Sequence, residues 1–157
     1  MPTSPKHSVL IIGVGNEHRG DDAAGLVAAR LLSGRSLPLR VVEEFGEATA
    51  LIDLWRSSAG QNVYLIDAMV SGQPPGYLQR FDARCEALPA ALGGGSSHMF
   101  SVAQAVELAR TLDNLPRKLI IYGIEAKSFD FGAGLSPEVE LGARIAVESI
   151  LAECFRP

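Results

Sequence analysis

Hydrophobic residues follow two alternating patterns along the chain: short continuous runs, and longer stretches with a helical repeat. The continuous runs are rich in Val, Ile and Leu, which is typical of strands buried on both faces of a sheet. They predict strands at residues 8–15, 39–44, 62–67 and 118–124, and a short edge strand at 77–81. The intervening stretches predict helices at 21–32, through Leu51, Leu54 and Trp55, at 100–112 and at 137–155.

This alternation of strands and helices predicts an α/β fold. We expect a three-layer α/β/α sandwich with a twisted, mostly parallel sheet of about five strands. The 157 residues contain no repeat and no linker, so we expect a single domain spanning 1–157. Ligands of such sheets bind beyond the carboxyl ends of the strands, and the loops there are the place to look for functional residues.

Composition excludes several classes of function. The net charge is −4 and basic residues are scattered, which argues against nucleic-acid binding. The longest apolar run, 9–15, is far shorter than the ~20 residues of a membrane span, and no signal-peptide cleavage site follows it. Cys85 and Cys154 form neither a chelating pair nor a disulfide framework. We therefore expect a cytoplasmic monomer that binds neither nucleic acid nor membrane.

The loop after the first strand, GVGNEHRGDD, stands where a nucleotide-binding turn would be. A dinucleotide fingerprint requires a third glycine where this chain has His18. A P-loop requires Lys and then Ser or Thr after its last glycine, but Asp21 and Asp22 follow Gly20 and would repel a phosphate. The loop therefore places two carboxylates at the start of a helix and does not form a phosphate-binding site.

Asp21 and Asp22 have ordinary structural explanations. Asp21 is expected to cap the helix, and Asp22 to complement its dipole. For Asp21 the structural role is favoured over a functional one. For Asp22 the two roles are balanced until the other strand ends are considered.

Two further polar residues are expected at the same edge of the sheet. Asp67 closes the apolar strand NVYLID, and His98 follows the glycine-rich loop 93–97 that leads into the third helix. The structural alternatives are that Asp67 only starts a turn and that His98 is a cap or surface residue, and His18 is a competing histidine. In this topology, Asp22, Asp67 and His98 nevertheless all lie at the edge of the sheet formed by the carboxyl ends of the strands. Two carboxylates and an imidazole suit a borderline divalent metal with open coordination positions.

Several ordered motifs carry a family resemblance over nearly the whole chain. They are GVGNEHRGDDAAG, LIDAMVSGQPPG, SSHMFSV, YGIE and GLSPEV. With these motifs the chain resembles the hydrogenase maturation endopeptidases of the HybD and HycI types. The resemblance implies a twisted five-stranded sheet between helices, and an endopeptidase that removes the C-terminal extension of a [NiFe]-hydrogenase large-subunit precursor after nickel insertion.

The resemblance also implies roles for individual residues. Asp22, Asp67 and His98 correspond to the two acids and the histidine that contact nickel in the incoming precursor. Asn16, Asp21 and the glycines Gly13 and Gly15 would shape the turn. The nickel is then supplied by the precursor, and no tightly bound resident metal is expected.

The chain departs from the family pattern in two places. Phe45 stands where many members have an acid in a DGGT-like stretch, with Glu44 and Glu47 as possible substitutes. Ala126 replaces a frequent proline after the YGIE-like glutamate. These changes leave the metal-contacting set intact and bear on which precursor is the substrate.

The common peptidase motifs are missing from the sequence. There is no G-x-S-x-G elbow and no HExxH, and neither cysteine has a histidine near it in sequence. The carboxylates and the histidine therefore favour an activated water, with the identity of the general base left open. Two alternatives are a hydrolase with a resident zinc on the same three side chains, and a non-catalytic adaptor that senses nickel in its client.

Overall fold

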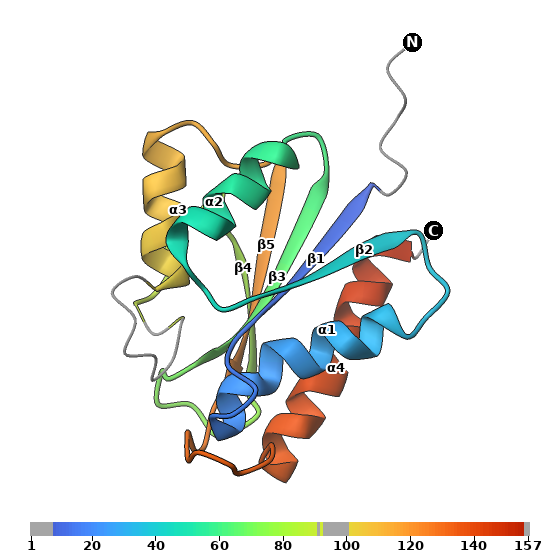
Figure 1. Ribbon diagram of the computed structural model, residues 1–157, viewed down its shortest axis with the longest axis vertical. Coiled ribbons are helices and arrows are strands. Elements are labelled where there is room, and N and C mark those ends of the chain that lie inside the picture. The colour runs from blue at the N-terminus through green and yellow to red at the C-terminus, as the bar shows by residue number, and fades with distance from the viewer. Residues whose placement is uncertain (1–7, 91, 93–100, 156–157) are drawn as a thin grey trace.

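The computed structural model describes residues 8–90, 92 and 101–155 (Figure 1). Within them, five strands form one sheet in the order β2-β1-β3-β5-β4. The strands are β1 (Val9–Val14), β2 (Leu39–Glu44), β3 (Asn62–Met69), β4 (Leu78–Asp82) and β5 (Lys118–Glu125). The helices are α1 (Ala24–Ser33), α2 (Ala48–Ser57), α3 (Val102–Thr111) and α4 (Pro137–Phe155), with a short 3₁₀ helix η1 (Gly20–Ala23) before α1.

Helices cover both faces of this sheet. Figure 1 shows α1 and α4 on one face and α2 and α3 on the other. Side chains alternate along β1, so that Leu10 and Ile12 belong to the core under α2 and α3, while Ile11 belongs to the core under α1 and α4. The structure thus confirms the predicted three-layer α/β/α sandwich.

The sheet is parallel except at one edge. β2, β1, β3 and β5 run parallel, whereas β4 pairs antiparallel with β5 and forms the edge. This confirms the edge strand that the short pattern at 77–81 predicts. No helix in the described part of the chain is long and apolar enough to cross a membrane.

Two predicted boundaries are wrong in ways that affect the site. β3 does not end at Asp67, because its pairing with β5 continues to Met69, opposite Glu125. Asp67 therefore lies inside the strand, and its side chain stays within the protein. The helix predicted at 21–32 begins instead with the tight turn η1, which contains Asp21 and Asp22.

Candidate active site

Asp22 and Asp67 come together where β1 and β3 reach the same edge of the sheet. The two strands are neighbours, and η1 lies against β3. Both side chains are buried, with exposed fractions of 5% for Asp22 and 1% for Asp67. Burial, and then the negative charge of Asp22, raise the pKa of Asp67, so the two carboxylates lie close enough to interact. The structure therefore brings together two of the three residues that the sequence places at this rim.

Asp67 is an incompletely satisfied carboxylate. Its Oδ1 accepts a hydrogen bond of 2.8 Å from the Ala68 N–H, while its Oδ2 has no partner among the described residues. Burial, and then the charge of Asp22, raise the pKa of Asp67 well above its ordinary value despite the bond from Ala68. Buried polar atoms without a partner are rare and costly, and they require an explanation. A metal-binding role offers one, because a cation would satisfy Oδ2 and offset the repulsion from Asp22.

Glycines allow the loop after β1 to fold tightly over the strand ends. Gly15 has a φ of 153°, and a Cβ atom there would overlap the Asp22 carbonyl oxygen. A Cβ atom at Gly25 would overlap the carbonyl oxygen of Ile66, next to Asp67. The backbone of η1 and α1 can thus approach β3 only because these positions lack side chains.

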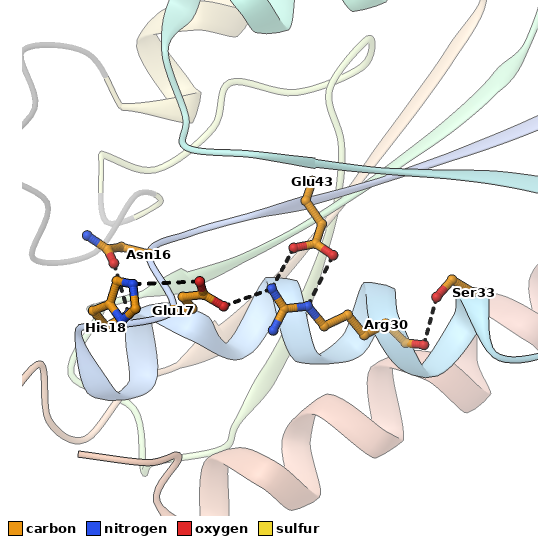
Figure 2. A network of polar contacts seen from close by, with 6 residues as sticks. All are labelled: Asn16, Glu17, His18, Arg30, Ser33 and Glu43. Atoms are coloured by element: carbon orange, nitrogen blue, oxygen red, sulfur yellow. Dashed lines mark hydrogen bonds and ion pairs between the residues drawn. The ribbon is translucent and has the colours of Figure 1, made fainter. Parts of the chain in front are cut away.

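Asn16 closes the same loop with a local hydrogen bond. Its Oδ1 accepts from the His18 N–H at 2.9 Å, and its carbonyl accepts from the Arg19 N–H at 3.2 Å. This agrees with a turn-shaping role for Asn16. The His18 side chain is exposed and lies 3.6 Å from Glu17 (Figure 2).

Asp21 is structural, but the predicted capping role is wrong. Neither η1 nor α1 has a side-chain cap hydrogen bond. Asp21 is fully buried and accepts four hydrogen bonds of 2.7–2.9 Å from the loop between β5 and α4. The donors are the Lys127 N–H, the Ser128 N–H, and the N–H and hydroxyl of Ser136. Burial alone would raise the pKa of Asp21, but these bonds lower it below its ordinary value.

Glu125 is a second buried structural acid, and the sequence analysis did not single it out. Its carboxylate accepts bonds from the Ser71 N–H at 2.8 Å, the Ser71 hydroxyl at 2.7 Å and the Gly72 N–H at 2.9 Å. It therefore holds the turn that follows β3. The available signal was the position of an acid at the end of an apolar strand, the same signal that selected Asp67.

The third predicted site residue, His98, lies outside the described residues, as does the glycine-rich loop before it. Within the described ranges, no group of three or more His, Cys, Asp or Glu side chains is arranged to hold a metal. The assignment of His98 to the site remains a prediction.

The two cysteines do not resemble activated nucleophiles. Cys85 is exposed, and a hydrogen bond with Asp82 followed by the charge of that carboxylate raises its pKa. Cys154 is half-buried in α4, and burial raises its pKa. Catalytic thiols instead have lowered pKa values. The carboxylates at the strand ends remain the better candidates for chemistry.

Known proteins similar to this chain share both its sequence and its fold. Residues 42–153 match the HycI family, described as hydrogenase maturation protease. The hydrogenase 2 maturation protease of Escherichia coli (strain K12) is 31% identical over 147 residues, which are 92% of this chain and 88% of that protein.

Two solved structures extend the likeness to three dimensions. An endopeptidase from Escherichia coli has 27% identity and a TM-score of 0.72, with 92% of this chain and 90% of that chain covered. The [NiFe] hydrogenase maturation protease HybD from Thermococcus kodakarensis has 26% identity and a TM-score of 0.67, with 94% and 99% covered.

Proposed function

Since the chain belongs to the hydrogenase maturation protease family, we propose that it removes the C-terminal extension of a [NiFe]-hydrogenase large-subunit precursor after nickel insertion. The chain is a peptidase, as its relatives are named proteases and endopeptidases. This argues against the alternative in which the protein is a non-catalytic adaptor. In the proposal the protein acts as a cytoplasmic monomer on this precursor.

One observation supports the nickel-dependent part of the proposal: the unpartnered Oδ2 of Asp67 beside the carboxylate of Asp22. Two adjacent buried carboxylates repel each other, and a divalent cation between them removes the repulsion. Asp22, Asp67 and His98 form a set of oxygen and nitrogen donors suited to such a cation. In the proposal this cation is the nickel of the precursor, a part of the substrate.

In the proposal, cleavage depends on whether the precursor contains nickel. A precursor with nickel gains the contacts to the carboxylates, and a precursor without nickel leaves the repulsion between them in place. Specificity then arises from the difference between these two complexes. The contact also sets the peptide bond in register beside the acids, which reduces the entropic part of the barrier.

Hydrolysis in this arrangement uses an activated water. The water oxygen attacks the carbonyl carbon of the peptide bond, and a carboxylate of the site accepts the proton. The carbon–nitrogen bond then breaks as the proton passes to the leaving amine nitrogen. The products are the mature carboxyl terminus and the released extension.

The test is a cleavage assay with matched precursors. Purified large-subunit precursor is incubated with the protein in its nickel-loaded and nickel-free forms, and intact mass is measured. We expect loss of a short C-terminal segment from the loaded form alone. Asp22→Asn and Asp67→Asn should abolish this loss, while Asp53→Asn, an exposed aspartate on α2, should retain it. Equal cleavage of both precursor forms would contradict nickel recognition, and cleavage of neither would contradict the whole proposal.

A further inference from the structure

The strand β2 forms one border of the sheet and has an open edge (Figure 1). In the described part of the chain, β2 pairs with β1 alone. The pairing runs without a bulge from Leu39, opposite Val9, to Glu44, opposite Val14, and the strand LRVVEE contains no proline. Bulges and prolines are common features that protect an edge strand from pairing with another chain. Because β2 has neither, its edge is available to an added strand.

Alternate residues of β2 direct their backbone polar groups away from the sheet. The Gly15 N–H donates to the Glu44 carbonyl at 3.1 Å, so Glu44 directs its backbone groups toward β1. In a parallel pair, every second residue bonds to the neighbouring strand, and the residues between them present both N–H and C=O to the other side. In β2 these intervening residues are Val41 and Glu43. Two N–H donors and two carbonyl acceptors therefore point outward, in the spacing that an added strand requires.

The side chains of these two residues are held on the face of the sheet that α1 covers. Figure 2 shows Glu43 extending from β2 toward Arg30 on α1. Arg30 donates from Nε and Nη2 to the two Glu43 oxygens at 3.1 and 2.8 Å, and from Nη2 to Glu17 at 3.1 Å. The two-point contact fixes the Glu43 carboxylate against α1. Val41 packs against the core on the same face. The edge is thus formed in advance, which lowers the entropic cost of adding a strand.

The carboxyl end of β2 lies beside the buried acids. The Glu44 carbonyl bonds to Gly15, and a Cβ atom on Gly15 would overlap the Asp22 carbonyl oxygen. Neighbouring strands are ~4.8 Å apart, so a strand added to β2 would lie ~10 Å from β1 and ~14 Å from β3, which carries Asp67. An extended chain covers this gap with about three to five residues. One segment can therefore pass the acids and then pair with β2.

The opposite edge of the sheet suits this segment less well. On β4, the Tyr77 carbonyl bonds to β5, so Leu78 and Arg80 direct their backbone groups outward. The next outward residue, Asp82, is engaged in its own turn. Its N–H donates to the Glu86 carboxylate at 3.2 Å, and its carbonyl accepts from the Glu86 N–H at 3.1 Å. The edge of β4 is also separated from β1 by β5 and β3, whereas β2 is next to β1.

We propose that the open edge of β2 binds the C-terminal extension of the precursor as an added antiparallel strand. β2 runs toward the acids and the extension leads away from the cleavage point, so the two chains run in opposite directions. Val41 and Glu43 each exchange a pair of N–H···O=C bonds with one residue of the extension. The six residues of β2 provide ~20 Å of edge for this pairing. The inference rests on the proposed function, because it takes a segment of the precursor as the occupant.

Amide hydrogen exchange followed by NMR tests the pairing, with a synthetic peptide that has the sequence of the precursor's C-terminus as the probe. In the free protein, the amides of Val42 and Glu44 should exchange slowly because they bond to β1, and those of Val41 and Glu43 should exchange rapidly. With peptide at about ten times its Kd, Val41 and Glu43 should exchange about tenfold more slowly. The outward amide of Arg80 on β4 is the control and should not change. The inference is overturned if no concentration of peptide slows Val41 and Glu43, or if Arg80 is slowed in their place.

A substitution at Val41 tests the same pairing by affinity. Val41→Pro removes one outward N–H and leaves the bonds to β1 in place, and edge strands tolerate proline at such positions. It should weaken peptide binding about tenfold, because one hydrogen bond is lost and the ring obstructs the added strand. Val41→Thr keeps the N–H and the β-branched shape, and as the matched control it should change the Kd less than about twofold. Equal Kd values for the two folded variants would contradict backbone pairing. If circular dichroism shows that Val41→Pro does not fold, the exchange rates of the wild type decide the question.

These outcomes separate the pairing at β2 from the proposed function. Slowed exchange at Val41 and Glu43 in a protein that cleaves no precursor would leave the pairing standing and refute the nickel-dependent cleavage. Nickel-dependent cleavage without slowed exchange would have the opposite meaning. In the precursor assay, Val41→Pro should raise KM and leave kcat nearly unchanged, because the edge binds the extension and takes no part in the chemical step.

Discussion

Replacing Asp21 with asparagine should destabilise the protein, because it removes a hydrogen-bond acceptor from a buried cluster of donors. Asp21 Oδ2 accepts three bonds and Oδ1 accepts one, from the Ser136 N–H at 2.7 Å. An asparagine side chain keeps one oxygen and presents an NH₂ group in place of the other, and NH₂ accepts no bond. In its best orientation the oxygen serves the three donors at Oδ2, and the amide opposes the Ser136 N–H.

The expected loss of unfolding free energy is about 3 kcal/mol. A buried N–H without an acceptor costs about 1–3 kcal/mol. The three remaining bonds change from charged to neutral, which costs about 1 kcal/mol each. The lower desolvation cost of a neutral amide offsets part of this loss.

Urea unfolding followed by circular dichroism measures the effect at pH 7. The control is Asp53→Asn, which breaks an exposed ion pair of 2.8 Å with Arg56 and should cost less than about 1 kcal/mol. The reasoning about Asp21 is refuted if both substitutions lower the urea midpoint equally.

The difference in stability between the wild type and Asp21→Asn should depend on pH, and the direction of this dependence follows from the pKa of Asp21. The pKa of Asp21 is lower in the folded protein than in the unfolded chain. Its stabilisation is therefore complete above the unfolded pKa, about 4, and is lost as pH falls through the folded value. The gap in stability between wild type and Asp21→Asn should shrink below about pH 4. A gap that widens on acidification would contradict a lowered pKa.

Three further predictions concern the site formed by Asp22 and Asp67 at the carboxyl ends of the strands. Asp67→Asn should abolish cleavage while preserving or raising the unfolding midpoint, since it removes a buried carboxylate whose Oδ2 has no partner in the described part of the chain; a large fall in the midpoint would contradict this. Gly15→Ala should lower the urea midpoint and impair cleavage, because the new Cβ overlaps the Asp22 backbone; Gly60→Ala, with open space around it, is the control. Elemental analysis of purified protein should find little tightly bound metal, whereas stoichiometric zinc that survives mild chelation would favour a resident-zinc hydrolase.

The order of the elements could be predicted because it depends on local hydrophobic pattern. The run at 62–67 is apolar enough to identify β3, and the short pattern at 77–81 correctly indicates an edge. The convergence of Asp22 and Asp67 also followed from topology, since parallel strands bring their carboxyl ends to one edge. The end of β3 did not follow, because pairing with β5 extends the strand to Met69.

The roles of the individual acids could not be predicted, because they depend on distant partners. The donors to Asp21 come from residues 106 to 115 positions further along the chain. Asp67 and Glu125 give the same signal in sequence, an acid at the end of an apolar strand. They differ because the turn after β3 directs its N–H groups toward Glu125, while no donor among the described residues reaches Oδ2 of Asp67.

The link between Asp21 and Ser136 has a consequence for synthesis of the protein on the ribosome. Asp21 and Asp22 emerge early, but the donors that hold Asp21 belong to the loop before the last helix. Pairing over so long a sequence separation comes late in folding. A nascent chain that stops before residue 127 leaves the η1 turn without its anchor. The η1 turn should therefore reach its final arrangement only after the loop between β5 and α4 has been made, and a nascent chain that lacks this loop should not cleave a precursor.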